Sequence, residues 1–494
     1  MNDHKGMLQL HVADNVAIAL VDGLAEGVAI GHKLALRRIA AGEAIIKYGQ
    51  PIGTATVAIE KGTHVHVHNV SVELGDRHGN ASGTASRNLG AGEPRTFSGF
   101  RRDNGSIATR NFVGIISTVN CSATVVRQIT ARFAPEVLER FPDVDGICPI
   151  THTTGCGMPG SGAGIDLLRR TLGGYIRHPN MAAVLVVGLG CEVNDIGNLL
   201  RSLDVEESDT LRTLAIQDAG GTRPAIDKAA GIVEELLAIA NRAERSAVPV
   251  SAISLALQCG GSDSFSGVSA NPALGYAADL LVAAGGTVIL GETPEIYGAE
   301  HLLLSRAASP AVADALLERL AWWQEYVAAN GASLNNNPSP GNIAGGISTI
   351  LEKSLGAVMK SGTSPLRGVY QYAEAISEPG FAFMDSPGYD PCSITGEIAS
   401  GANIVCFTTG RGSVFGAKPV PSLKLASNSA MATRMHEDMD YDCGRILTGD
   451  KTLAEAGAEI FELIVQTAGG SKSASELHGL GDFEFVPWQI GAVL

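Results

Sequence analysis

One pattern recurs in this chain: an apolar run of strand length, a short polar loop with a cysteine, and a segment of helical character. The runs are 112–119, 146–150, 182–187 and 252–257, and the cysteines that follow them are Cys121, Cys156, Cys191 and Cys259. Strands that alternate with helices predict parallel, doubly wound α/β sheets. The loops after such strands meet at one edge of the sheet, where ligands bind.

The start of the chain has a different character. Residues 1–72 contain short runs with the alternation typical of β-strands, so we expect a small β-rich domain there. Residues 73–98 are rich in Gly, Asn and Ser without an apolar period, which indicates a linker. We expect a first α/β domain at 99–247 and a second at 248–494, which ends in a helix and a tail.

Composition excludes several classes of protein. The 494 residues are 45% hydrophobic and carry a net charge of −15, which argues against a nucleic-acid partner. The sequence contains no run of about 18 apolar residues, the length that a membrane span needs, and the N-terminus lacks the pattern of a signal peptide. The eight cysteines lack the spacing of a disulfide scaffold, so we expect reduced thiols and a cytoplasmic protein.

Several loops carry groups suited to binding hydroxyls and carboxylates, namely Ser262, Asn271, Thr408 and Arg411. Arg411 can hold a carboxylate through two parallel hydrogen bonds, although it could equally be a surface arginine in a turn. Lys353 could act as a base or a carboxylate partner, or be a solvated helix lysine. The chain lacks a P-loop and lacks a GxGxxG motif after its first strand, so we expect no nucleotide cofactor.

A stretch near residue 66 predicts a metal site. If 64–68 is a strand, His64, His66 and His68 point to one face, where they could hold a transition metal or an anion. The alternative is a solvated polar face, with Val65 and Val67 on the buried side.

The loop cysteines allow a second metal hypothesis. Thiolates bind soft metals and iron–sulfur clusters, but these cysteines lack paired spacing, which disfavours a cluster. His152 and Cys156 form a local pair, although no third group orients them as in a Cys/His hydrolase.

The motifs together resemble one known family. The matching stretches are 31–36, 47–53, 152–157, 187–194, 258–272, 337–346, 352–356 and 407–412. Over nearly its whole length the chain resembles the altronate/galactarate dehydratases of bacterial sugar-acid metabolism. Its N-terminal part resembles the small SAF domain of that family.

This resemblance implies β-elimination of water from an aldonate or aldarate, which gives a 2-dehydro-3-deoxy sugar acid. It also implies a divalent metal, Fe²⁺ or Mn²⁺. The His-rich segment 64–68 looks closer to altronate dehydratases, and the segment 258–281 at least as close to galactarate dehydratases. A related lyase acting on a sulfonated hydroxy acid and a non-catalytic sugar-acid-binding protein are the alternatives. We expect the protein to form a homodimer.

The chemistry guides the assignment of roles. Removing the proton next to a carboxylate requires a base and a cation that stabilises the developing charge, and the departing hydroxyl needs an acid. As catalytic residues we predict His32, Lys33, His152, Asp263 and Lys353. As metal ligands we predict His64, His66, His68, Cys156, Cys191, Glu192 and Cys259. The substrate carboxylate is expected near Arg411 and the loop 259–263, with Ser262, Asn271 and Thr408 also binding substrate.

Overall fold

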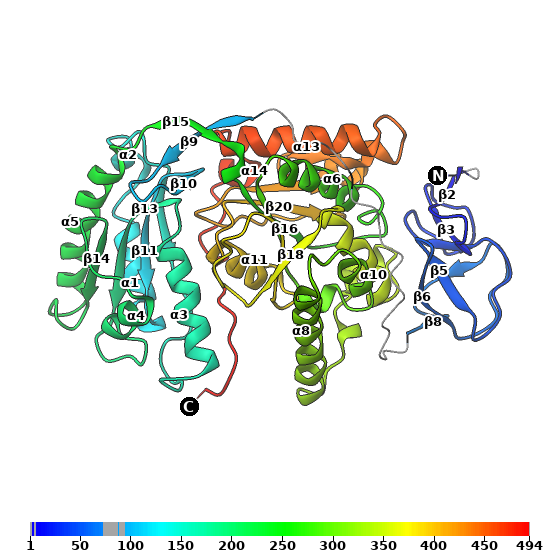
Figure 1. Ribbon diagram of the computed structural model, residues 1–494, viewed down its shortest axis with the longest axis horizontal. Coiled ribbons are helices and arrows are strands. Elements are labelled where there is room, and N and C mark those ends of the chain that lie inside the picture. The colour runs from blue at the N-terminus through cyan, green and yellow to red at the C-terminus, as the bar shows by residue number, and fades with distance from the viewer. Residues whose placement is uncertain (1, 4–5, 73–86, 88–93, 494) are drawn as a thin grey trace.

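The computed structural model describes residues 2–3, 6–72, 87 and 94–493. A β-rich N-terminal domain is followed by a second domain and a larger C-terminal domain, and the C-terminal domain lies between the other two (Figure 1). Both later domains contain parallel sheets flanked by helices, so the predicted fold class is confirmed. Most of the predicted linker 73–98 lies outside the described residues. Its last part was wrong, because strand β9 begins at Thr96.

The N-terminal domain consists of two small antiparallel sheets, ordered β1-β2-β3-β4-β7 and β5-β6-β8. Their strands are β1 Asn2–Asp3, β2 Met7–Gln9, β3 Val16–Ala19, β4 Lys33–Ala35, β5 Ala44–Lys47, β6 Gln50–Ala55, β7 His64–Val65 and β8 Val70–Ser71. Strand β7 pairs with β4 so that Val65 lies opposite Lys33 and His64 opposite Leu34. This pairing brings the His-rich segment next to His32.

The second domain holds a four-stranded parallel sheet, ordered β12-β11-β13-β14. Its strands are β11 Phe112–Ser117, β12 Gly146–Ile150, β13 Met181–Gly188 and β14 Leu211–Ala215, and its helices are α1 Asn120–Thr130, α2 Pro135–Leu138, α3 Ala163–Ile176, α4 Ile196–Leu203 and α5 Thr222–Ala240. A small antiparallel sheet, β10-β9-β15, adjoins it, with β9 Thr96–Arg101, β10 Ile107–Ala108 and β15 Arg245–Pro249. Strand β11 is buried along its whole length, as its continuous apolar sequence predicts for a central parallel strand.

The C-terminal domain is built on a seven-stranded parallel sheet, ordered β18-β19-β17-β16-β20-β21-β22. Its strands are β16 Ser254–Cys259, β17 Thr287–Leu290, β18 Leu366–Tyr370, β19 Gly380–Met384, β20 Ile404–Thr409, β21 Ser422–Ala426 and β22 Tyr441–Asp442. Its helices are α6 Ala270–Ala283, α7 Glu300–Leu304, α8 Pro310–Ala329, α9 Pro340–Ala344, α10 Ile350–Val358, α11 Asp390–Ala399, α12 Ser429–Arg434, α13 Leu453–Ala468 and α14 Ala474–Leu477. The strand order changes direction between β16 and β20, where an open α/β sheet forms its binding crevice.

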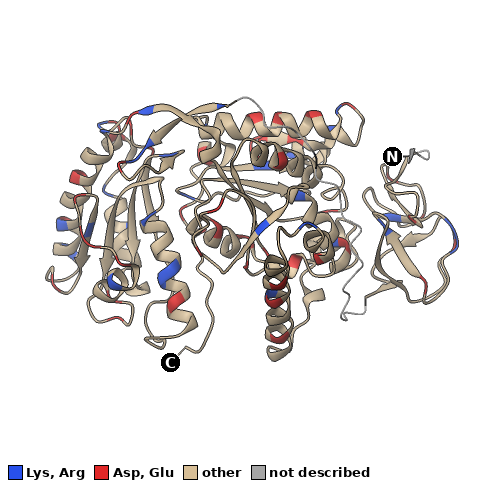
Figure 2. Cartoon of the chain, viewed as in Figure 1, with Lys and Arg blue, Asp and Glu red and all other residues tan. Residues whose placement is uncertain are grey.

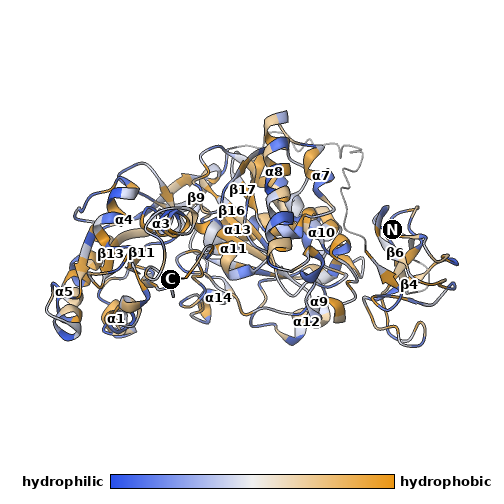
Figure 3. Cartoon of the chain, turned by 90° about the horizontal axis from the view of Figure 1, so that it is seen from below, coloured by the Kyte–Doolittle hydropathy of each residue, from blue (hydrophilic) through white to orange (hydrophobic). Residues whose placement is uncertain are grey.

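The domains pack through continuous apolar contacts. One buried cluster joins the N-terminal domain to strands of the C-terminal sheet, and a second joins helices α3 and α11. At Gly174 a β-carbon would lie 2.3 Å from the carbonyl oxygen of Ala399, so only glycine allows α3 to approach α11 this closely. Hydrophobic colouring concentrates on the strands of the two sheets, whereas the outer helix faces are mixed (Figure 3).

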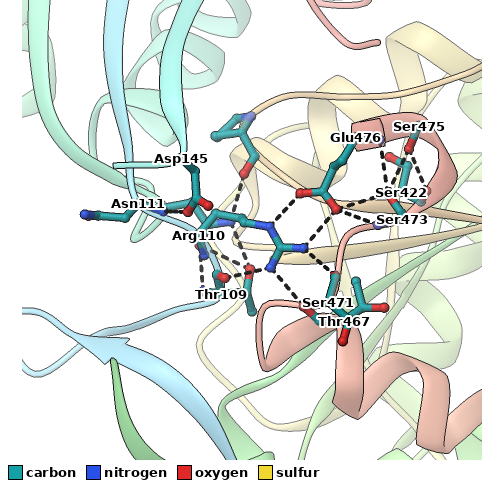
Figure 4. Close-up of polar contacts among 12 residues, drawn as sticks. Thr109, Arg110, Asn111, Asp145, Ser422, Thr467, Ser471, Ser473, Ser475 and Glu476 are labelled. Carbon is teal, nitrogen blue, oxygen red and sulfur yellow. Dashed lines mark hydrogen bonds and ion pairs between the residues drawn. The ribbon is translucent and has the colours of Figure 1, made fainter. Parts of the chain in front are cut away.

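A buried arginine also links the second and C-terminal domains. Arg110, which is 2% exposed, donates through Nε and Nη2 to the two oxygens of Glu476, at 2.6 and 2.8 Å. Its Nη atoms also donate to the carbonyl oxygens of Thr467 and Ser471 (Figure 4). Such bidentate pairs fix geometry as well as contributing energy, so this contact holds the two domains in one orientation.

Lys and Arg are interspersed with Asp and Glu along the three domains (Figure 2). Within the described part of the chain, no helix is both long enough and apolar enough to cross a membrane.

Candidate active site

Two lysines of the N-terminal domain share one carboxylate of the C-terminal domain. Lys33 Nζ lies 2.8 Å from Oε2 of Glu352, and Lys47 Nζ lies 2.7 Å from Oε1. All three side chains are at most 1% exposed. Lys33 also donates to the carbonyl oxygen of Gly346, and Ser348 donates to Glu352 through both N and Oγ. The contact between the two domains thus encloses a fully hydrogen-bonded charge cluster.

The electrostatics of this cluster follow from burial and charge. Burial alone would raise the pKa of Glu352, but the charges of Lys33 and Lys47 lower it overall. Burial, with the neighbouring charge of Lys47, lowers the pKa of Lys33 to about 8 although Glu352 opposes this. Burial would lower the pKa of Lys47 as well, but the charge of Glu352 raises it overall, so Lys33 is the lysine of the pair whose charged form is less favoured.

Three imidazoles lie beside this cluster. His32 Nδ1 is 2.9 Å from His64 Nε2, and ligand atoms of His32, His64 and His66 all lie within 4.8 Å of one another. His32 Nε2 also approaches the carbonyl oxygen of Ala344, at the end of α9, at 3.2 Å. Burial is the main cause that lowers the pKa of His64 and of His66 to about 4, and it lowers that of His32 as well. These shifts favour the neutral imidazole, which is the form that binds metals.

The predicted strand at 64–68 was wrong. Strand β7 contains only His64 and Val65, and residues 66–69 form a turn in which the Asn69 side chain accepts a hydrogen bond from the His66 N–H. The turn brings His66 towards His32 and leaves His68 exposed, with its ring 5.3 Å from that of His64. Among the described residues, the potential ligand group therefore contains His32 in the place predicted for His68.

A second group of ionisable side chains lies at the ends of β16 and β17. Lys360 Nζ is 2.8 Å from Cys259 Sγ, and this sulfur is 3.7 Å from Oε2 of Glu295. Lys353 Nζ contacts Glu295 Oε1 at 2.6 Å, and Cys259, Glu292 and Glu295 also form a potential ligand group. The predicted site residues Lys353 and Cys259 thus lie together.

The same cluster contains carboxylates whose ionisation is disfavoured. Both oxygens of Glu292 and of Glu397 are buried without a hydrogen-bond partner, and burial raises the pKa of each. Glu292 also has a φ of 67°, a left-handed conformation that is rare for residues other than glycine. Burial and the charge of Glu295 raise the pKa of Asp390 to about 6. The ammonium of Lys360 lies 3.9 Å from Glu292 Oε2. Backbone strain and carboxyl groups with raised pKa values concentrate at functional sites.

In the loop after β16, some side chains have hydrogen-bond partners within the protein and others have none. Asp263 Oδ1 accepts hydrogen bonds from the backbone N and Oγ of Ser266 and from Ser427 Oγ, and Oδ2 accepts from Asn428. These bonds engage both carboxylate oxygens, so Asp263 holds the loop in place, and its catalytic role stays a prediction. Ser262 Oγ, by contrast, is buried without a partner.

Among the other predicted substrate-binding residues, Asn271 and Thr408 already have protein partners, whereas Arg411 is exposed. Asn271 accepts a hydrogen bond from Thr408 Oγ1 at 2.6 Å and donates to the carbonyl oxygen of Gly356. These two side chains therefore brace the sheet edge. Arg411 is exposed next to Gly261, at the mouth of this region.

The remaining predicted residues lie in the second domain. His152 is buried, its Nε2 lies 3.0 Å from the carbonyl oxygen of Ser117, and burial lowers its pKa to about 4. Glu192 accepts bonds from Thr118 Oγ1 and from the backbone N of Leu189, Gly190 and Cys191, so its carboxylate anchors a loop. These residues do not join the site at the domain contact. The predicted residues that lie there are Lys33, Lys353, Cys259, Ser262, Asp263, Asn271, His32, His64 and His66.

Sequence reasoning assigned no role to Glu352, Glu295 and Lys47. Lys47 ends the apolar strand β5, and a lysine at a buried strand end is the signal that could have identified it. Glu352 lies in α10 and Glu295 in the short 3-10 turn Thr293–Glu295 after β17, and only tertiary packing brings the two carboxylates to the site.

Three family models match consecutive parts of the chain. The altronate/galactarate dehydratase SAF domain matches residues 5–73, the D-galactarate dehydratase/altronate hydrolase second domain matches 99–241, and the D-galactarate/altronate dehydratase C-terminal model matches 250–493.

Characterised relatives are similar in sequence to this chain over most of its length. The altronate dehydratase of Bacillus subtilis is 34% identical over 94% of this chain and 95% of its own length. The galactarate dehydratase (L-threo-forming) of Escherichia coli is 35% identical over 94% of this chain and 93% of its own length. The (2R)-sulfolactate sulfo-lyase subunit beta of Chromohalobacter salexigens is 32% identical over 79% of this chain and 97% of its own length. The chain therefore belongs to the altronate/galactarate dehydratase family.

Proposed function

We propose that this protein is a metal-assisted hydro-lyase that removes water from a sugar acid, an aldonate of the D-altronate type, to give a 2-dehydro-3-deoxy sugar acid. One observation carries the proposal: three imidazoles, of His32, His64 and His66, lie beside a buried Lys–Glu–Lys cluster where two domains meet. Family membership supports the same reaction class.

The three histidines fit a divalent metal. His66 Nδ1 is buried without a hydrogen-bond partner, and two ring nitrogens of His32 and His64 face each other at 2.9 Å. A divalent ion held there, Fe²⁺ or Mn²⁺ in our proposal, would act as a Lewis acid towards the substrate carboxylate and hydroxyls.

The side chains around the proposed metal position include a candidate for the base of the reaction. Lys33, whose pKa burial lowers to about 8, is our candidate for accepting the α-proton, because a base works best when its pKa lies near the working pH. Glu352 and Lys47 hold Lys33 in place. His32 belongs to the proposed ligand group, so departure of the C3 hydroxyl is left to the Lewis-acid chemistry that a bound ion would supply.

Substrate recognition is assigned to hydroxyl groups that lack a protein partner. Ser262 Oγ and Ser264 Oγ are both buried and unbonded, next to Lys47, Glu352 and Lys353. An unpaired buried hydroxyl costs free energy, which a substrate hydroxyl can recover. Arg411, at the mouth, is our candidate for the first contact with the substrate carboxylate.

The site is closed as it stands. The cavity at the domain contact has a volume of ≈ 10 Å³, which is room for about one water molecule. A sugar acid therefore enters only when the N-terminal and C-terminal domains move apart. Reclosure would exclude water from the Lys33–Glu352 cluster and strengthen its interactions.

The test is a substrate panel. Purified protein is incubated anaerobically with Fe²⁺ or Mn²⁺ and with aldonates and aldarates, and keto-acid formation is followed by semicarbazide absorbance. We expect product from altronate, loss of activity on chelation and recovery on adding the metal. Product from galactarate alone would support an aldarate dehydratase, and keto acid from no substrate would refute the proposed function.

A lyase acting on a sulfonated hydroxy acid is the second candidate. It is favoured by the likeness to the sulfolactate sulfo-lyase subunit, which spans 97% of that subunit. Release of sulfite from sulfolactate in the same panel would support this candidate over dehydration.

A further inference from the structure

The second domain carries a set of thiols that the proposed function does not use. Of the eight cysteines, all of which are among the described residues, only Cys121, Cys156 and Cys191 are exposed. They follow β11, β12 and β13, which are neighbours in the parallel sheet. The chain runs from β11 to one side for β12 and then to the other side for β13, so the thiols surround the point where such a sheet binds ligands. A free cysteine is usually buried, and three exposed ones at one sheet edge are unusual.

Hydrogen bonds join the three loops into one surface. The backbone N of Asn120 donates to the carbonyl oxygen of Thr154 at 2.9 Å, and the backbone N of Asn194 donates to that of Gly155 at 3.0 Å. Asn194 Nδ2 also donates to the carbonyl oxygen of Thr118 at 3.1 Å. Gly155 has a φ of 100°, and a β-carbon there would lie 2.4 Å from the Thr118 oxygen. Only glycine lets the Cys156 loop lie against the Cys121 loop.

The loop of Cys191 is held before any ligand binds. Glu192 Oε2 accepts hydrogen bonds from the backbone N of Gly190 and of Cys191, at 2.7 and 2.9 Å. Gln217 Nε2 donates to Cys191 Sγ at 3.4 Å. Hydrogen bonds to sulfur stabilise a thiolate and tune clusters that thiolates ligate.

We propose that Cys121, Cys156 and Cys191 ligate a [4Fe–4S] cluster whose fourth iron has no ligand from the chain. In the described structure the three sulfur atoms do not all lie within 4.8 Å of one another, as one shared ion would require. A cubane cluster spaces its thiolates more widely than a single ion does. The nearby His152 is not available as a fourth ligand, because Nε2 contacts the Ser117 carbonyl oxygen and Nδ1 accepts from the Thr154 N–H.

Assembly of the cluster from iron, sulfide and the three thiols requires no oxidant or reductant. Two ferrous and two ferric ions combine with four sulfide ions and three thiolates, and the three thiols release their protons. The sheet edge belongs to the second domain, whereas the His32–His64–His66 site lies on the far side of the C-terminal domain (Figure 1). The cluster is therefore a separate centre and does not depend on the proposed function.

The test uses the full chain, purified anaerobically and reconstituted with ferrous and ferric iron and sulfide. We expect about four iron and four sulfide ions per chain. A broad visible absorption band and a paramagnetic signal after reduction by dithionite are expected with them. Cys121→Ser, Cys156→Ser and Cys191→Ser should each lower the sulfide content and the band.

Two controls separate the cluster from other effects. Cys392→Ser should keep the full band, because Cys392 is buried and contacts Tyr372 Oη instead. His66→Ala should also keep it, whatever its effect on turnover. The apo forms of the serine variants should unfold at the temperature of the apo wild type, which shows that cluster loss is not misfolding.

Several outcomes would overturn the proposal. These are iron without sulfide, iron lost in His66→Ala but kept in the three serine variants, zinc bound in place of iron, and a disulfide between two of the three cysteines in the anaerobic protein.

Discussion

Lys33 Nζ lies 2.8 Å from Oε2 of Glu352, across the contact between the N-terminal and C-terminal domains, and both side chains are at most 1% exposed. Strand β4 supplies the lysine and helix α10 the carboxylate. Removing two such charges from water is costly, and the attraction between them offsets the cost only when every remaining hydrogen-bonding position is filled. Here Lys47, Ser348 and the Gly346 carbonyl oxygen fill those positions. The contact between the N-terminal and C-terminal domains therefore depends on Lys33 and Glu352 both being ionised.

Glu352→Gln should destabilise the protein by about 3–5 kcal/mol, because it leaves Lys33 and Lys47 buried without a compensating charge. Denaturant unfolding followed by circular dichroism measures this change. Glu60→Gln is the matched control: its partner Arg38 is exposed, so the variant should lie within about 0.5 kcal/mol of wild type. Equal stability of all three proteins would mean that the cluster contributes nothing to the domain contact.

Ser262→Ala should raise the KM for the sugar acid and leave the free energy of unfolding unchanged or slightly higher, because the buried Ser262 hydroxyl has no protein hydrogen bond to lose. For the neighbouring residue Asp263 we expect a substitution to lower the stability of the protein. Asp263→Asn disturbs hydrogen bonds from Ser266, Ser427 and Asn428 and should cost about 1–3 kcal/mol of stability. Steady-state kinetics and unfolding curves of the two variants check this. An unchanged KM in Ser262→Ala would remove this serine from substrate binding.

Asp390 gives a prediction about pH. Burial raises its pKa to about 6, above the value of about 3.9 in an unfolded chain. Between these two values the folded state holds more protons than the unfolded state, so the contribution of Asp390 to stability is full below pH 4 and is lost as the pH rises through 6.

Asp390→Asn removes this titration. The variant should match wild type below about pH 4 and become more stable than wild type by about 2–3 kcal/mol above pH 6. Unfolding curves measured at a series of pH values test this. A stability difference that does not vary with pH would contradict the shifted ionisation.

The strand and loop pattern of the sequence was sufficient to predict both parallel sheets, because continuous apolar runs such as Phe112–Ser117 are typical of central parallel strands. It also placed Cys259 at a strand end. It failed at residues 64–68, where alternating His and Val look like a strand but the Asn69 side chain stabilises a turn. Local side-chain hydrogen bonds of this kind compete with strand pairing and leave little trace in an apolar pattern.

The site was harder to predict than the fold. His32, Lys33 and Lys353 were predicted as catalytic residues. The carboxylate partners of the two lysines, Glu352 and Glu295, were not, because a glutamate is usually solvated and only tertiary packing buries these two. Asp263 was predicted as a catalytic residue and Glu192 as a metal ligand, and both carboxylates accept hydrogen bonds that hold their loops together. The sequence shows which side chains can do chemistry, whereas the hydrogen bonds that already occupy them appear only in the structure.

The most direct test of the proposed site compares His66→Ala with His68→Ala. Both residues lie in one turn, but His66 is 8% exposed with an unpartnered nitrogen, whereas His68 is exposed and outside the ligand group. Titration of the metal-free proteins with Mn²⁺ by calorimetry, together with turnover of the sugar acid, measures both properties. We predict that His68→Ala binds the ion and turns over like wild type, while His66→Ala loses both. Wild-type metal binding and turnover in His66→Ala would contradict a metal site at the contact between the two domains.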